Sequence, residues 1–136
     1  MQYIQHQGQK IPALGFGTWQ IKGEDCVQSV QKALDIGYRH IDTAQAYENE
    51  LDVGKALDQH DVERKNVFLT TKIWIENFEP EKFMKSLDES LNKLQTDYVD
   101  MLLVHWPSEE HDMDTTLHTL VKAPKAYRHS RFVICS

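Results

Sequence analysis

One stretch of this chain decides its fold: Gly37-Tyr-Arg-His-Ile-Asp42-Thr-Ala-Gln-Ala-Tyr47-Glu-Asn-Glu50. The first part predicts a short strand over residues 38–42, and the loop that follows carries Tyr47. A helix is then expected to begin at Asn49 or Glu50. An acidic residue at the carboxyl end of a strand, followed by a tyrosine in the next loop, is typical of a site built on an α/β scaffold.

Two later strands end on a polar residue in the same way. Residues 67–71 predict a strand that leads directly to Lys72, and the nearly all-apolar residues 98–104 predict a strand that leads to His105. A strand this apolar is typical of a parallel sheet with both faces buried. We therefore expect three successive strands to deliver Asp42, Lys72 and His105 to one rim.

The remaining pattern alternates between strands and helices. Residues 2–12 predict a β-hairpin around Gly8, and residues 13–17 predict a short strand. Helices are expected over residues 24–36 and 50–59, from Pro80 onward, and from near Asp114. Regular alternation of this kind favours an α/β fold with a parallel sheet or barrel. Pro124 is expected to break the last helix at Ala123, and residues 132–134 are a candidate fifth strand.

Length and composition narrow the class of protein. The chain has 136 residues, enough for one domain with a core, and a net charge of −6 that gives no support for nucleic-acid or acidic-membrane binding. No stretch approaches the ~18 apolar residues of a membrane span, and no signal-peptide pattern opens the sequence. Two isolated cysteines, Cys26 and Cys135, leave a disulfide open but suit a reducing compartment better. We expect a soluble, cytoplasmic protein.

The candidate catalytic residues are Asp42, Tyr47, Lys72 and His105. A phenol is a poor proton donor at neutral pH, with an ordinary pKa near ~10, but a nearby lysine cation stabilises the phenolate and lets the phenol act as a general acid. The aspartate would hold the lysine in place, and the histidine would orient a carbonyl oxygen. This set suits proton delivery to a carbonyl whose hydride comes from a cofactor.

Each of these four residues also has a purely structural interpretation. Alone, Asp42 could cap a loop, Tyr47 could pack, and His105 could be a satisfied core histidine. Lys72 is the stronger signal, because a partly buried lysine needs a partner. The four placements together favour the catalytic interpretation.

The tryptophans allow two interpretations, and the remaining histidines are interpreted as structural. Trp19, Trp74 and Trp106 each follow a predicted strand end, which is equally consistent with core packing and with an aromatic pocket for a small substrate. The other histidines lack metal-ligand spacing, so we interpret them as surface or loop residues and expect no metal site. They are His6, His40, His60, His111, His118 and His129.

From about Ile11 to Leu120 the chain resembles the aldo-keto reductases, most closely bacterial reductases of the 2,5-diketogluconate or methylglyoxal kind. The segments that carry the resemblance are Gly15-Phe-Gly-Thr-Trp19, Gly37-Tyr-Arg-His-Ile-Asp-Thr-Ala44, Tyr47, Glu50, Val53-Gly54, Thr70-Thr-Lys-Ile-Trp74 and Asp100-Met-Leu-Leu-Val-His-Trp-Pro107. They are long and occur in the expected order.

The resemblance implies a (β/α)8 barrel that binds NADPH and reduces aldehydes or ketones to alcohols. It implies that Tyr47 is the general acid, that Lys72 and Asp42 tune it, and that His105 orients the carbonyl. It also places Trp19, Trp74 and Trp106 at the substrate pocket, and Gly17, Thr18 and Asp42 near the cofactor.

The chain departs from the family in length, because a complete barrel needs ~250 residues. We expect residues 1–121 to form the N-terminal half of such a barrel, a truncated domain that lacks most of the family's cofactor site. Residues 122–136 form an atypical tail, for which we hypothesise a frameshift or an early stop. An open half-barrel would leave inner-face residues such as Leu102 and Val104 uncovered, so we expect it to be unstable alone, to aggregate, or to pair with a second copy as a homodimer. The alternative to a working reductase is therefore an inactive half-barrel that dimerises or has no role of its own.

Overall fold

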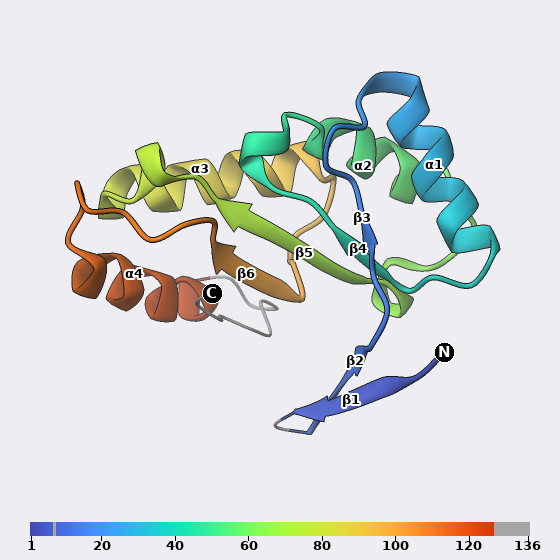
Figure 1. Ribbon diagram of the computed structural model, residues 1–136, viewed down its shortest axis with the longest axis horizontal. Helices are drawn as coiled ribbons and strands as arrows, with labels where there is room; N and C mark the ends of the chain where they lie inside the picture. The colour runs from blue at the N-terminus through green and yellow to red at the C-terminus, as the bar shows by residue number, and fades with distance from the viewer. Residues whose placement is uncertain (7, 127–136) are drawn as a thin grey trace.

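The computed structural model describes residues 1–6 and 8–126, and within them a four-stranded parallel sheet positions the candidate site (Figure 1). The strand order is β3 (Phe16–Gly17), β4 (His40–Asp42), β5 (Phe68–Ile73) and β6 (Met101–Val104). Each strand pairs with the next one along the chain, with Gly17 beside Asp42 and Lys72 beside Leu103. The sheet therefore follows the βα order that the sequence predicts.

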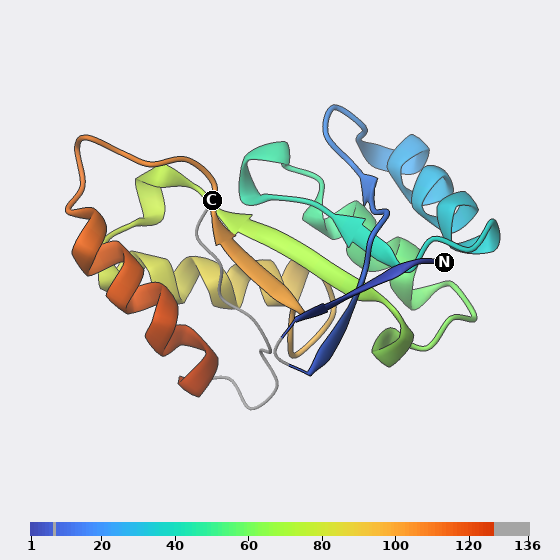
Figure 2. The ribbon, with the colours of Figure 1, turned by 60° about the horizontal axis from the view of Figure 1, so that its bottom comes forward.

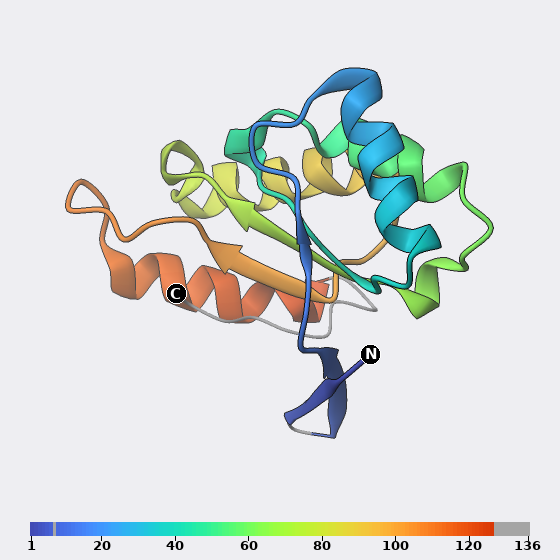
Figure 3. The same cartoon turned by 45° about the vertical axis from the view of Figure 1, so that its right-hand side comes forward.

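The helices follow the strands in turn. They are α1 (Gly23–Asp35), α2 (Glu50–Asp58), α3 (Pro80–Lys93) and α4 (Met113–Ala126), with short 3-10 turns η1 (Gln45–Tyr47), η2 (Arg64–Asn66) and η3 (Ile75–Asn77) between elements. Figure 3 shows the helices along the outside of the curved sheet. A hairpin of β1 (Tyr3–His6) and β2 (Gln9–Pro12) precedes the sheet, as expected, and lies near the amino ends of β5 and β6.

Local signals in the sequence set the helix ends. Pro80 occupies the first turn of α3, where its missing N–H costs nothing. Gly37 follows α1 with a φ of +102°, a left-handed conformation that glycine adopts without a steric penalty. The expectation that Pro124 ends α4 is wrong, since the helix continues to Ala126. A proline this close to a helix end removes only one hydrogen bond from the last turn.

The core lies between the sheet and the helices. Leu102 and Val104 are each 1% exposed and belong to a buried cluster with residues such as Phe83, Leu87 and Leu120. The expectation that these two strand residues are uncovered is therefore wrong. Side chains alternate along a strand, and in β6 it is Met101 and Leu103 that face the open side of the sheet.

His40 also departs from its expected place on the surface. It lies within β4, its ring is 4.9 Å from that of Phe68, and its Nε2 is 2.9 Å from Thr70 Oγ1. Burial lowers the pKa of this imidazole, which keeps the ring neutral inside the sheet.

Some expectations fall on residues that the structure does not describe. The candidate fifth strand at 132–134, most of the proposed atypical tail and Cys135 all lie outside residues 1–6 and 8–126. Cys26 is a buried free thiol. Within the described residues, no helix is both long enough and apolar enough to cross a membrane.

Candidate active site

The carboxyl ends of three neighbouring strands bring the predicted polar residues together. Asp42 ends β4, Lys72 is the penultimate residue of β5, and His105 directly follows β6. The loops that follow these strands lie at the same end of the sheet (Figure 2). The expected common rim is therefore present.

Lys72 is the centre of this group. Its Nζ donates to Asp42 Oδ2 at 2.8 Å, to the Thr43 carbonyl at 3.1 Å and to the Tyr47 hydroxyl at 3.2 Å. The lysine side chain is only 14% exposed, whereas Asp42 is 32% exposed. The partner that a half-buried lysine requires is thus Asp42, and the same ammonium lies against the phenol oxygen.

Tyr47 reaches this position through the tight η1 turn between β4 and α2. The turn ends at Glu48, whose φ of +54° reverses the chain before the helix begins. The Lys72 ammonium lies 4.8 Å from the centre of the Tyr47 ring as well as within hydrogen-bond distance of its hydroxyl. A cation in this place favours the phenolate that remains once the phenol has given up its proton.

The His105 ring is held by aromatic neighbours. Tyr47 and Trp74 contact it at nearly right angles, with ring centres 5.6 Å and 5.3 Å away, and Trp106 stacks beside it at 6.0 Å. Its Nδ1 is buried and has no hydrogen-bond partner among the described residues. The pKa of this imidazole is lowered by burial first and by the Lys72 charge second. The ring is therefore neutral, and its single proton belongs on Nε2, since a buried Nδ1–H would have no acceptor.

These side chains open onto a cavity of about 390 Å³. It is lined by Trp19, Ala46, Tyr47, Trp74, His105 and Trp106. Trp19 and Trp106 are 66% and 61% exposed, so core packing does not explain them. All three tryptophans line this one cavity, so the structure favours an aromatic pocket over core packing.

The residues expected near a cofactor differ in whether they have polar atoms or space free to contact a ligand. The N–H and Oγ1 of Thr18 both donate to the Asp42 carbonyl, so they already have protein partners. Gly17 is different, because a Cβ added there would meet no protein atom within 4 Å. Asp42 Oδ1 accepts no hydrogen bond from the described residues, in contrast to Oδ2. Asp42 and the open side of Gly17 therefore fit a hydroxyl-bearing ligand, such as the ribose of a nicotinamide nucleotide.

Two amide side chains that flank Tyr47 were missed from the sequence. Asn49 is buried, and its Nδ2 donates to the carbonyls of Thr18 and Ile21 at 2.7 Å and 2.8 Å. It stands at the N-cap of α2 but makes no capping hydrogen bond with its side chain. Gln45 joins η1 to the loop after β5. The only sequence signal was the spacing of two amides on either side of a candidate catalytic tyrosine.

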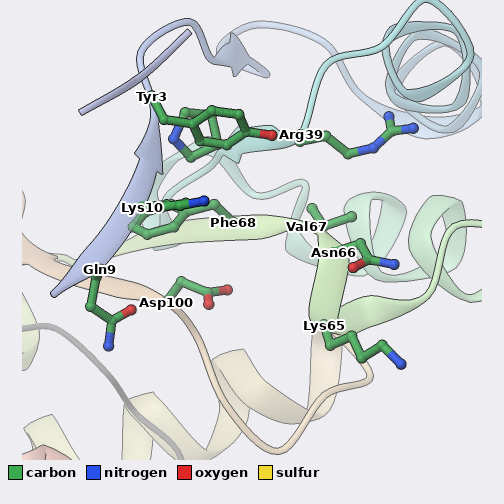
Figure 4. A pocket seen from close by; sticks show the side chains of 10 residues that line it. Tyr3, Gln9, Lys10, Arg39, Lys65, Asn66, Val67, Phe68 and Asp100 are labelled. Atoms are coloured by element: carbon green, nitrogen blue, oxygen red, sulfur yellow. The ribbon is translucent and has the colours of Figure 1, made fainter. Parts of the chain in front are cut away.

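A second hollow, of about 380 Å³, lies at the opposite end of the sheet beneath the hairpin (Figure 4). Its polar groups do not converge on a common point. The Arg39 and Lys65 side chains point away from the space beside Tyr3, and Arg39 donates to the Leu34 and Tyr38 carbonyls. Asp100 is bound to Arg64 at 2.9 Å. These groups support the fold, and the pocket beside Tyr47 is the better candidate site.

Comparisons with known proteins agree with this geometry. The model of the Aldo/keto reductase family matches residues 13–126. Methylglyoxal reductase DkgB of Escherichia coli O157:H7 is 49% identical over 117 residues, which are 85% of this chain and 44% of that protein. Methylglyoxal reductase DkgA of Escherichia coli K12 is 49% identical over 100 residues, which are 74% of this chain and 36% of that protein.

Solved structures match over nearly the whole chain. The crystal structure of a putative 2,5-diketo-D-gluconic acid reductase B superposes with a TM-score of 0.93 at 41% identity, covering 99% of this chain and 48% of the other. The chain thus spans less than half the length of these relatives. The expected fold, part of a (β/α)8 barrel, is confirmed.

Proposed function

The chain belongs to the aldo/keto reductase family, and from this premise we propose that it reduces small aldehydes or ketones to alcohols, with Tyr47 as general acid and NADPH as cofactor. The observation that carries this proposal is the position of Lys72 Nζ, which lies 2.8 Å from Asp42 Oδ2 and 3.2 Å from the Tyr47 hydroxyl. A charged lysine beside a phenol at the edge of a pocket suits proton donation to a carbonyl oxygen.

In the proposed reaction the carbonyl carbon would receive its hydride from a nicotinamide cofactor, which supplies this chemistry when bound. Tyr47 gives its hydroxyl proton to the carbonyl oxygen, and the Lys72 ammonium stabilises the phenolate that remains. Asp42 keeps the ammonium in place through its Oδ2. His105 donates a hydrogen bond from Nε2–H to the carbonyl oxygen and so orients the carbonyl between Tyr47 and the pocket wall.

We assign only the nicotinamide end of the cofactor to this chain. Asp42 Oδ1 would accept a hydrogen bond from a ribose hydroxyl, and the open side of Gly17 would let the ligand approach the backbone. The choice of NADPH over NADH rests on the family alone. The substrates we propose are small carbonyl compounds such as methylglyoxal, because relatives are named for that reaction and three tryptophans shape a small pocket.

The test is the rate of NADPH oxidation with methylglyoxal. We expect Tyr47→Phe to lower kcat by roughly 10²–10⁴-fold, the usual contribution of a general acid. The matched control is Tyr38→Phe, which removes the same hydroxyl at the opposite end of β4, where the ring packs edge-on against Phe16. A Tyr47→Phe chain that turns over as fast as the control would overturn the proposed role. A fluorescence titration with NADPH tests cofactor binding separately from turnover.

The second candidate function is an assembly role, favoured by the open face of the sheet. Met101 and Leu103 lie half-exposed on that face, and β3 and β6 are its outer strands. We propose that a second copy of the chain covers this face and pairs with these edges. Light scattering should then show a dimer that Leu103→Glu converts to a monomer. Leu51→Glu, at an exposed site on α2, should leave it dimeric. A monomeric wild-type chain would refute the pairing.

A further inference from the structure

Gln45 makes four hydrogen bonds from the turn that carries Tyr47. Its Oε1 accepts from the backbone N–H of Trp74 at 2.8 Å and from Asn77 Nδ2 at 3.0 Å. Its Nε2 donates to the Ser86 carbonyl at 3.2 Å and to Ser90 Oγ at 3.1 Å. One side chain therefore fastens η1 both to the loop after β5 and to α3.

The residue that this amide fastens is a wall of the pocket. Trp74 is half-buried, and its ring lies 5.3 Å from His105 at an angle of 89°. Among the described residues, no hydrogen bond fixes the His105 imidazole, and its Nδ1 is buried without a partner. The orientation of His105 therefore depends on the rings packed against it, and the backbone of one of these rings is held by Gln45.

We propose that Gln45 is a positioning residue for the reaction: it acts through Trp74 to hold the His105 ring in the orientation that presents Nε2–H to the carbonyl. This inference rests on the proposed function for its catalytic meaning. The contact chain from Gln45 to Trp74 to His105 stands on geometry alone. If Trp74 were no longer held by Gln45, its ring would pack less firmly against His105, and the imidazole would adopt a wider range of orientations.

The test compares two substitutions that both remove the amide donor to α3 but differ in the acceptor. Gln45→Met keeps the length of the side chain and loses both the donor and the acceptor for Trp74 N–H. Gln45→Glu loses the donor but keeps that acceptor. Gln59→Met, at an exposed position after α2, is the matched control. The first readout is the NMR resonance of the His105 ring proton Hε1, assigned with His105→Gln, because the Tyr47 and Trp74 rings shift this resonance.

We expect Gln45→Met to move the His105 resonance toward its random-coil position and to speed hydrogen exchange at the Trp74 amide. Gln45→Glu should restore both. In the kinetic assay Gln45→Met should lower kcat/KM by roughly 10- to 100-fold, the usual effect of a small misplacement, with Gln45→Glu close to wild type. If Gln45→Met does not fold, Asn77→Ala removes the second bond to the same oxygen and should shift the resonance in the same direction.

The outcomes separate this inference from the proposed function. A His105 resonance that stays in place while the Trp74 amide becomes exposed would overturn the positioning role, whatever the activity. A moved resonance in a chain whose wild type shows no turnover would support the contact chain and count against the reductase. A kinetic loss equal in Gln45→Met and Gln45→Glu would also overturn it, because the Trp74 acceptor would then be irrelevant.

Discussion

Gly54 is the glycine at which an added methyl group should destabilise the fold most. It lies in α2, and a Cβ built on it would meet the backbone of the last turn of α3, including the Lys93 carbonyl oxygen. The carbonyl carbon and Cα of Leu94 would lie 2.8 Å and 2.9 Å from this Cβ. Ordinary contacts between carbon atoms are ~3.5–4.0 Å, and backbone cannot rotate aside as a flexible side chain can. Gly54→Ala therefore requires the two helices to separate.

The magnitude follows from two opposing effects. Alanine is the better helix former by about 1 kcal/mol, which favours the variant. Overpacking of a tight contact costs about 1–3 kcal/mol, and we place this cost at the upper end, about 3 kcal/mol, because the added Cβ would meet backbone atoms of Lys93 and Leu94. We expect a net loss of about 2 kcal/mol in the free energy of unfolding, which lowers the urea midpoint by roughly 1 M.

Urea unfolding followed by circular dichroism measures this loss. Gly17→Ala is the matched control, because its added Cβ meets nothing within 4 Å and its backbone is not in the left-handed region. We expect its urea midpoint to be close to that of the wild type. A Gly54→Ala chain that unfolds at the same urea concentration as this control, or higher, would show that α2 and α3 are not in backbone contact.

Three further substitutions test cofactor binding, the role of Lys72 and the pH dependence of stability. Gly17→Ala should weaken NADPH binding in a fluorescence titration without loss of stability, and unchanged binding would mean that no ligand approaches this glycine. Lys72→Met should lower kcat by roughly 100-fold while the urea midpoint changes little, since Asp42 stays partly solvated. The pKa of Glu50 is raised by burial above its ordinary 4.5, so its contribution to stability is present below that pH and is lost as pH rises. Glu50→Gln should therefore flatten the pH dependence of the urea midpoint above pH 4.5, and an unchanged dependence would contradict this.

The arrangement of the four candidate catalytic residues could be predicted because strand ends carry that information. Each βα unit has its own periodic signal, and consecutive parallel strands are neighbours, so residues that end consecutive strands must meet. The predicted partner of Lys72 was found at 2.8 Å for this reason. The pocket of tryptophans follows the same logic, although the sequence could not separate it from core packing.

The face of the sheet to which each β6 side chain points could not be predicted, because the residue types along this strand do not differ in polarity. In β6, Met101, Leu102, Leu103 and Val104 are all apolar, so nothing in the residue types shows which pair faces the helices. The helices that cover the sheet determine which alternate residues of β6 are buried. This is why Leu102 and Val104 were assigned to the wrong face.

The partners of Gln45 and Asn49 were invisible for a different reason. Gln45 bonds to residues 29 to 45 positions away, and Asn49 bonds to carbonyls 28 and 31 positions before it. Hydrogen bonds of this range depend on tertiary structure, and a polar residue at a helix start is ordinarily interpreted as a cap. Asn49 stands at that position without capping, so the local rule gave no hint of its role.

Two separate sets of contacts thus build the candidate site. The charges are set by the paired strands β4 and β5, because Asp42 lies beside Thr70 and Lys72 reaches back across that pair to Asp42 and Tyr47. The pocket walls are set by loops, which are held to the turn around Tyr47 by two amides. Substitution of a charged residue should therefore change the chemical step, whereas substitution of Gln45 should change how a carbonyl is oriented while the Lys72 contacts remain. The contact between Lys72 and Tyr47 can be kept intact while the pocket wall is altered, which makes the two proposed roles separable by experiment.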